Sequence, residues 1–193
     1  MQVAIIYHSG FGHTQIVAEE IRKGILEAGV NVTLVNTESA IANTELLNEF
    51  DTLVFGSPTY FGNVSAEFKK FMEATGTIWY KQLWRNKLAA GFTHSSTLCG
   101  DKFHTLNSLF LFAAQHSMLW IPLGIMPQHD KHTGLQLPEP NGLGSYMGLM
   151  TYSGNDAAGF NQPLDLKTAF AFGKRIGELT RKHNFLNKQS INN

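Results

Sequence analysis

The stretch VAIIYHSGFGHT, residues 3–14, decides the fold, because an apolar run ends abruptly in a turn rich in glycine and hydroxyl groups. Residues 3–7 have no polar interruption, which predicts a strand that is buried on both faces. From residue 14 to 28, the apolar side chains of Val17, Ile21 and Ile25 recur at helical spacing. The chain therefore opens with a strand, a tight turn and a helix.

The rest of the chain repeats this alternation. Apolar runs predict further strands at 30–35, 51–56, 87–92 and 118–123, and helical patterns lie at 40–50, 64–75, 103–116 and 163–183. The helix at 103–116 is apolar almost throughout, so we expect it to be nearly enclosed. Strands that alternate with helices at this spacing predict an α/β fold with a parallel sheet and helices on both faces. Five strands favour a doubly wound sheet, which binds ligands at the carboxyl ends of its strands.

Length and composition narrow the class of protein. The 193 residues suit one substantial core, so we expect a single domain over 1–193, with a loop excursion at about 124–160 that is rich in Gly, Pro, His and Asn. Fifteen basic and fifteen acidic residues balance, which argues against a nucleic-acid partner. No segment is long enough to span a membrane, and the first apolar run is too short for a signal peptide. With a single cysteine, Cys99, the chain suits a reducing compartment, and we expect it to be cytoplasmic.

The turn that follows the first strand has the composition of a phosphate site. Gly10 and Gly12 let the backbone approach a ligand closely, Ser9 and Thr14 add hydroxyl groups, and a helix N-terminus favours an anion. The turn has no lysine, so the Walker pattern is absent, and the dinucleotide pattern G-x-G-x-x-G meets Gln15 at its third glycine. We expect a phosphomonoester held by neutral dipoles; the alternative is a capped turn without a ligand.

Two further loops follow predicted strands. In residues 57–63, Tyr60 and Phe61 offer flat apolar surface on which a planar ring could stack. Residues 93–100 carry a run of hydroxyl groups that could serve the polar edge of the same ring. Each loop also has a plainer interpretation, because aromatic side chains often tuck into a core and hydroxyl-rich turns are often only solvated.

Eight histidines raise the question of a metal site. His129 and His132 flank Asp130, but no third ligand is spaced convincingly near them, and a zinc site needs three or four placed ligands. We therefore expect no bound metal. Cys99 has no evident base beside it, so we assign it no nucleophilic role.

Three blocks of sequence resemble the flavodoxin-like NAD(P)H:quinone oxidoreductases of the WrbA type. They are SGFGHT, SPTYFGN with the downstream FMEATGTIW, and KLAAGFTHSST with the closing HSMLWIPLG. The resemblance runs from residue 3 to the last helix and implies a flavodoxin-like sheet in the order 2-1-3-4-5. It further implies FMN as the cofactor, NAD(P)H as the electron donor, a quinone or similar flat acceptor, and a homodimer or homotetramer.

The resemblance also implies the site residues. The first loop would hold the phosphate of FMN through Ser9, Gly10, Phe11, Gly12, His13 and Thr14. The second loop would line the isoalloxazine ring with Pro58, Thr59, Tyr60, Phe61, Gly62 and Asn63, and the third would contact its polar edge with Ser95, Ser96, Thr97 and Gly100. Two residues match catalytic positions of the family: His116 matches a flavin-contacting histidine, and Trp79 matches a tryptophan over the flavin, often from a neighbouring subunit.

The chain departs from the family pattern in each of the three loops. The family commonly has tyrosine at the position of Phe11, arginine at that of Tyr60, and glycines where this chain has Leu98 and Cys99. These changes bear on nicotinamide-nucleotide binding and on the acceptor more than on FMN. Two alternatives stay open: an FMN-binding electron carrier that docks protein partners, and a binding module that has lost the flavin.

Overall fold

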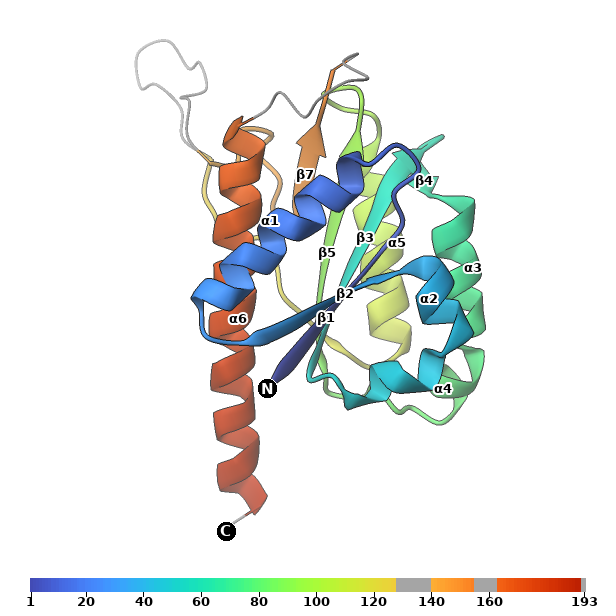
Figure 1. The fold of residues 1–193 in the computed structure, drawn as a ribbon, viewed down its shortest axis with the longest axis vertical. Coiled ribbons are helices and arrows are strands. Elements are labelled where there is room, and N and C mark those ends of the chain that lie inside the picture. Colours follow the sequence, from blue (N-terminus) through green and yellow to red (C-terminus); the bar gives the residue numbers. More distant parts are fainter. Residues whose placement is uncertain (128–139, 155–162, 192–193) are drawn as a thin grey trace.

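The computed structural model describes residues 1–127, 140–154 and 163–191, and strands alternate with helices along them (Figure 1). The strands are β1 (Gln2–Tyr7), β2 (Asn31–Asn36), β3 (Thr52–Tyr60), β4 (Asn63–Val64), β5 (Leu88–Ser95), β6 (Leu119–Trp120) and β7 (Leu149–Tyr152). The helices are α1 (His13–Glu27), α2 (Thr37–Ala42), α3 (Ala66–Ala74), α4 (Gly76–Tyr80), α5 (Lys102–Gln115) and α6 (Pro163–Ile191), with a 3-10 helix at Thr44–Glu49.

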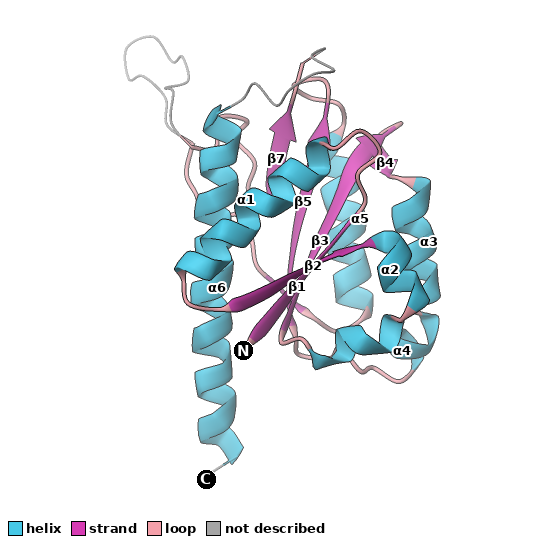
Figure 2. Ribbon diagram, viewed as in Figure 1, coloured by secondary structure: helices cyan, strands magenta, loops and turns pink. Residues whose placement is uncertain are grey.

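The main sheet is parallel and runs in the order β2-β1-β3-β5-β6. The predicted order 2-1-3-4-5 is thereby confirmed. In the central register, Ile5 of β1 lies opposite Leu34 of β2 and Val54 of β3. Helices α1 and α6 cover one face, and α2 to α5 cover the other (Figure 2). This is the doubly wound arrangement that the alternation predicts.

The fifth position in the sheet is shared by two short strands. β6 pairs with Leu88 and Ala89 at the start of β5, while β7 pairs with the second half of β5, from Phe92 to Ser95. The predicted strand over 118–123 is therefore wrong in its extent. Pro122 has no N–H group to continue the ladder, and the chain leaves the sheet there. The expected excursion at 124–160 contains β7, and part of it lies outside the described residues.

Strand β1 is buried on both faces, as its sequence predicts. Ile5 packs in the apolar cluster beneath α1 and α6, and Ile6 packs in the cluster beneath α3 and α5. Helices α1 and α6 approach each other at glycines: a Cβ atom on Gly24 would lie 2.0 Å from the carbonyl oxygen of Phe170. Only glycine permits this close contact, which fixes where α1 begins relative to the sheet.

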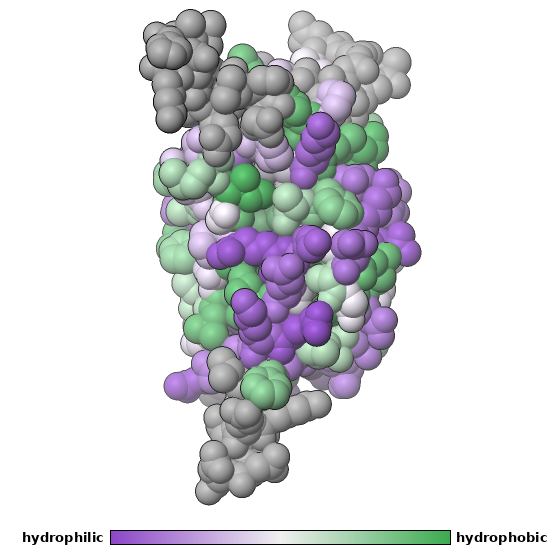
Figure 3. Space-filling view, turned by 90° about the vertical axis from the view of Figure 1, so that its left-hand side faces the viewer, coloured by the Kyte–Doolittle hydropathy of each residue, from purple (hydrophilic) through white to green (hydrophobic). Residues whose placement is uncertain are grey.

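Helix α5 is less enclosed than its composition predicts. Leu106 and Leu109 are fully buried against the sheet, but Phe103 is 60% exposed and Leu111 is 52% exposed. A helix that packs with one side buries only one stripe, even where its other side is apolar. The opposite side of the molecule differs: hydrophilic side chains gather across the middle of the face that α1 and α6 present (Figure 3). Throughout the described residues, no helix has the length and hydropathy needed to cross a membrane.

Candidate functional site

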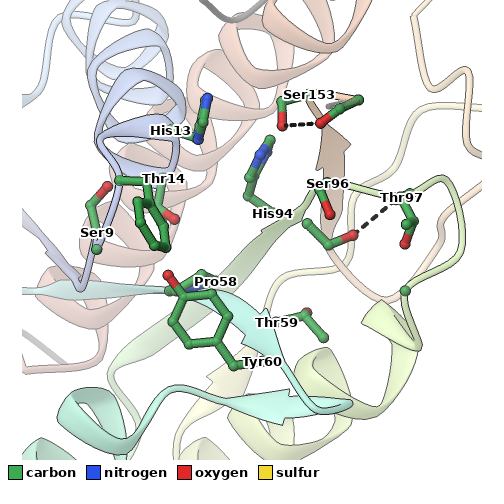
Figure 4. A pocket seen from close by; sticks show the side chains of 15 residues that line it. Ser9, His13, Thr14, Pro58, Thr59, Tyr60, His94, Ser96, Thr97 and Ser153 are labelled. Carbon is green, nitrogen blue, oxygen red and sulfur yellow. Dashed lines mark hydrogen bonds between the residues drawn. The ribbon is translucent and has the colours of Figure 1, made fainter. Parts of the chain in front are cut away.

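A cavity of about 440 Å³ opens at the carboxyl ends of the parallel strands. It brings together parts of all three predicted loops and the end of β7 (Figure 4). The lining residues are Ser9, Gly10, Phe11, His13, Thr14, Pro58, Thr59, Tyr60, His94, Ser95, Ser96, Thr97, Gly100, Ser153 and Gly154. Its volume lies within the range of about 300–1,000 Å³ that is usual for ligand and cofactor sites.

The first loop leaves the N-terminus of α1 open to an anion. The helix is preceded by Gly12 at a φ of 88°, this glycine supplies no side-chain cap, and the first turn holds no acidic residue. The hydroxyl of Ser9 accepts a hydrogen bond of 3.2 Å from the N–H of Gln15. A Cβ atom on Gly10 would lie 2.7 Å from the hydroxyl oxygen of Tyr60, so a larger residue there would require the Tyr60 side chain to shift. Gly12 shapes the turn and does not itself line the cavity.

The second loop is more ordered than expected. β3 continues through Pro58 and Thr59 to Tyr60, and a two-residue turn at Phe61 and Gly62 returns the chain into β4. Pro58, Thr59 and Tyr60 line the cavity, whereas Phe61 is fully exposed. Phe61 and Asn63 line a separate groove between α3 and α5, and Gly62 lines neither. The structure therefore brings only the first half of this loop to the cavity.

The third loop brings all four of its predicted site residues to the cavity, since Ser95, Ser96, Thr97 and Gly100 line it. Figure 4 places Ser9 and Thr14 on one side of the cavity and Thr97 on the other. The cavity thus joins the N-terminus of α1 to a loop of polar groups, with the β3 side chains between them. No lysine or arginine occurs among the described residues that line it.

Sequence reasoning missed His94, which lines the cavity and is 4% exposed. Its Nδ1 lies 2.9 Å from the hydroxyl oxygen of Thr151, and its ring stacks on the ring of His13. Burial, together with the nearby charges of His13 and Lys102, lowers the pKa of His94 to about 3. The ring is therefore neutral at pH 7. Its place at the carboxyl end of a predicted strand was the available signal.

Ser153 and Gly154 also line the cavity and were not predicted. They follow β7, which pairs with β5 from a position far along the chain. Nothing in the local pattern of residues indicates which strand β7 joins, so sequence alone offered no signal for these two.

The structure does not bring His116 to the cavity. The cavity lies at the N-terminal end of α5, and His116 follows the other end, about 21 Å away for 14 residues at the usual rise. Its ring is 2% exposed and packs 4.5 Å from that of Trp84, and Nε2 lies 3.1 Å from the hydroxyl oxygen of Thr75. Burial lowers the pKa of His116 to about 4. His116 therefore does not line this cavity, and its contact with a flavin stays a prediction.

Trp79 likewise lies away from the cavity of its own chain. It belongs to α4, at the opposite end of the sheet from the tips of β5 and β7 (Figure 1). Its side chain is 48% exposed and borders a shallow depression that also reaches His116. A contribution of Trp79 to the site of a neighbouring copy stays a prediction.

The histidines suggested for a metal site, His129 and His132, lie outside the described residues together with Asp130. Within the residues that are described, no group of three His, Cys, Asp or Glu side chains is arranged to hold a metal ion.

Comparison with known proteins agrees with this geometry. A family model described as a flavodoxin domain matches residues 4–100. Flavodoxin FldP of Pseudomonas aeruginosa is 33% identical over 92% of this chain and 96% of its own length. Quinone-oxidoreductase QR2 of Triphysaria versicolor is 30% identical over 94% of this chain and 96% of its own. The crystal structure of a WrbA-like flavodoxin from Agrobacterium tumefaciens matches with a TM-score of 0.72 and 31% identity, covering 94% and 98% of the two chains. The chain belongs to the flavodoxin-domain family, and within it is similar to the WrbA-like proteins.

Proposed function

We propose that the chain is an FMN-dependent oxidoreductase that passes two electrons from NAD(P)H to a quinone or a similar flat acceptor. This proposal rests on one observation: the N-terminus of α1 and the polar third loop line the same cavity. The names of relatives support the reaction: QR2 is a quinone oxidoreductase, and a relative from Archaeoglobus fulgidus, 27% identical over 94% of this chain, is an NAD(P)H dehydrogenase (quinone).

The residues at the cavity fit FMN. Hydroxyl groups of Ser9 and Thr14 and N–H groups at the start of α1 would hold its phosphate without a cationic side chain. The stretch from Pro58 to Tyr60 and the third loop would flank its ring. When bound, FMN supplies the chemistry of accepting a hydride and releasing the electrons to an acceptor.

Two of the groups at the cavity, His94 and Tyr60, would bind and orient without exchanging protons with the solvent near pH 7. His94 is neutral there, because its pKa is lowered to about 3. Burial raises the pKa of Tyr60, so its phenol keeps its proton and can donate a hydrogen bond beside Gly10. Phe11 is 82% exposed at the rim of the cavity, where a flat acceptor could stack.

The alternative is an FMN-binding electron carrier that docks protein partners. The name of the FldP relative, a flavodoxin, supports it. The balanced charge of this chain does not favour it, since docking of redox proteins is commonly steered by opposite charge.

Absorption spectroscopy distinguishes these functions. The purified protein is titrated with FMN, and the complex is then mixed rapidly with NADPH or NADH, followed by a quinone. Prompt bleaching of the flavin band and its return on addition of quinone support the enzyme. A bound flavin that does not react with either nucleotide supports the carrier, and a protein that takes up no FMN contradicts both.

We also propose a homodimer or homotetramer in the cytoplasm. The groove between α3 and α5 is lined by apolar groups such as Phe61, Met72 and Leu111, and a second copy would cover it. Cys99 is a free, exposed thiol, which suits a reducing compartment. Analytical ultracentrifugation of the purified chain tests the assembly.

A further inference from the structure

Lys102 is an unusual residue to find at the start of α5. Its side chain is 1% exposed and is one of the largest fully buried side chains in the described part of the protein. Lysine is almost never fully buried unless its ammonium group is paired. Here the three N–H groups of Nζ donate to Ser95 Oγ at 2.8 Å, to Thr97 O at 2.7 Å and to Leu98 O at 2.8 Å. All three acceptors belong to the third loop.

The loop closes tightly around this ammonium group. The hydroxyl of Ser95 also donates to Thr97 O at 2.9 Å, so one carbonyl oxygen receives two hydrogen bonds. Gly100, at a φ of +54°, completes the turn, and a Cβ atom there would lie 2.5 Å from Ser95 Oγ. Hydrogen bonds from a charged donor are roughly twice as strong as neutral ones. Lys102 is thus the centre that holds the third loop in one conformation.

The same bonds fix which way the amides of the loop point. In a trans peptide the C=O and N–H groups point in opposite directions, and the described residues contain no cis peptide. Because the carbonyls of Thr97 and Leu98 point at Nζ, the N–H groups of Leu98 and Cys99 point away from it. Within the described residues, neither N–H group donates to a protein acceptor. Two donors are therefore presented on the side of the loop that faces away from Lys102, in the segment between Thr97 and Gly100, which both line the cavity.

We propose that Lys102 is a positioning residue, which pre-orders the third loop so that the amides of Leu98 and Cys99 meet the polar edge of the flavin ring. The inference rests on the proposed function for the identity of the ligand. With the phosphate of FMN at the N-terminus of α1, its ring would extend along the cavity toward the third loop. The carbonyl groups at the polar edge of the flavin ring require N–H donors. Lys102 would thereby order the turn at Leu98 and Cys99, the positions where the family pattern has glycines.

The charges that face Lys102 define a pH test. The titratable groups near it are Asp165 of α6, Cys99 in the loop and the neutral His94 of β5, and none forms an ion pair with it in the described structure. Burial lowers the pKa of Lys102 to about 8, against the attraction of Asp165 and Cys99. Burial raises the pKa of Asp165 to about 6, opposed by the N–H of Tyr152, which donates to it at 2.9 Å. Above about pH 8, Lys102 therefore loses one of its three N–H donors while Asp165 and His94 keep their states.

The experiment compares the wild type with Lys102→Met and Lys102→Gln, and uses Lys167→Met, at an exposed lysine of α6, as the matched control. All four proteins are made in a Cys99→Ser background, so that the thiol does not enter the pH comparison, and "wild type" here means that background. ¹⁵N relaxation on the flavin-free proteins gives order parameters for residues 96–99. Fluorescence quenching gives the Kd of FMN and of riboflavin between pH 6.5 and 9.5.

We expect the order parameters to fall from about 0.85 to below about 0.6 in Lys102→Met. The Kd of FMN and of riboflavin should rise by the same factor, about tenfold or more, because the ring is affected and not the phosphate. Wild-type affinity should weaken above about pH 8, and the variant should lack this step. Lys167→Met should behave as the wild type.

A rigid loop in Lys102→Met, or flavin affinities within twofold of the wild type, overturns the proposal. If the variant does not fold, Lys102→Gln and the wild-type pH profile decide, and a profile without a step near pH 8 overturns it. If the wild type binds neither flavin, the proposed function fails, and the order parameters alone then decide whether Lys102 orders the loop.

Discussion

The imidazole rings of His13 and His94 stack with their centroids 5.1 Å apart and their planes inclined by 18°. His13 is the first residue of α1 and His94 lies near the end of β5, so the stack joins the first loop to the third. Two protonated rings at this distance would repel each other, and burial already keeps His94 neutral. The contact therefore depends on the protonation of His94.

Acid should destabilise the flavin-free protein through His94. The unfolded chain takes up a proton at this residue near pH 6.5, whereas the pKa of His94 in the folded chain is about 3. Between these values the unfolded state binds more protons, so the free energy of unfolding falls as the pH falls, by up to about 1.4 kcal/mol per pH unit. Urea unfolding of the wild type and of His94→Gln over this range measures the difference in slope.

The comparison of slopes isolates His94. Asp165, whose pKa is raised to about 6, acts in the opposite sense, because the folded chain holds its proton more tightly than the unfolded chain. His116, with its pKa lowered to about 4, acts in the same sense as His94. Both contributions are present in the two proteins and cancel. Equal slopes in wild type and variant would contradict the assignment.

Replacing Ser9 should weaken the binding of the FMN phosphate and leave the binding of the flavin ring unchanged. Ser9→Ala removes a hydroxyl that lines the cavity and accepts from the N–H of Gln15. We expect FMN to bind about tenfold more weakly, since one lost hydrogen bond to a charged group is worth about 1.5 kcal/mol or more. Riboflavin affinity should not change. Fluorescence titration measures both, and Ser39→Ala, at an exposed serine of α2, serves as the control. Parallel losses for the two flavins would argue against a phosphate site at Ser9.

Phe61 should be replaceable with a gain in stability. It lies at a φ of 49° in the two-residue turn between β3 and β4, followed by Gly62 at 72°. Asn-Gly is the preferred pair for such a turn, and Phe61 is fully exposed, so Phe61→Asn should stabilise the chain by about 1 kcal/mol. Thermal unfolding should show a rise in Tm of about 2–4 °C.

The same variant should weaken self-association, because Phe61 lines the groove that a second copy would cover. Sedimentation velocity at several concentrations measures this effect. Gly62→Ala is the contrasting control: it places a side chain at a φ of +72° and should lower the Tm instead. A Tm for Phe61→Asn at or below that of the wild type would show that the turn tolerates phenylalanine without cost.

His116→Leu should reduce stability and leave flavin binding intact. The change removes the contact with Thr75 and the ring packing against Trp84 and Phe112. We expect a loss of about 1–3 kcal/mol in the free energy of unfolding. The Kd of FMN for the isolated chain should stay within twofold. Selective loss of FMN binding without loss of stability would restore the role that the family resemblance implies.

The sequence predicts the local elements better than their partners. β1 and α1 follow from an apolar run and a helical stripe, both of which are local patterns. The strands at the edge of the sheet do not follow from local patterns. Both the run at 118–123 and the later segment at β7 supply residues that pair with β5. Which of them pairs with each half of β5 depends on Pro122 and on contacts between residues far apart in the chain.

The site shows the same division. The cavity could be predicted because the carboxyl ends of parallel strands meet at one edge, which brings the three loops together. His94 was missed because the third loop was interpreted by its hydroxyl groups alone. His116 does not line the cavity, because α5 separates it from the three loops, and a resemblance in sequence does not indicate that separation.

The shared edge formed by β6 and β7 makes this protein tolerant of changes in length. The chain departs after Trp120 and rejoins the same margin at Leu149, so its path between these points is closed at both ends by strand pairing. Doubling such a connection costs only about 0.6 kcal/mol in closure entropy. A fluorescent reporter or an affinity tag could be inserted there without disturbing Ser153.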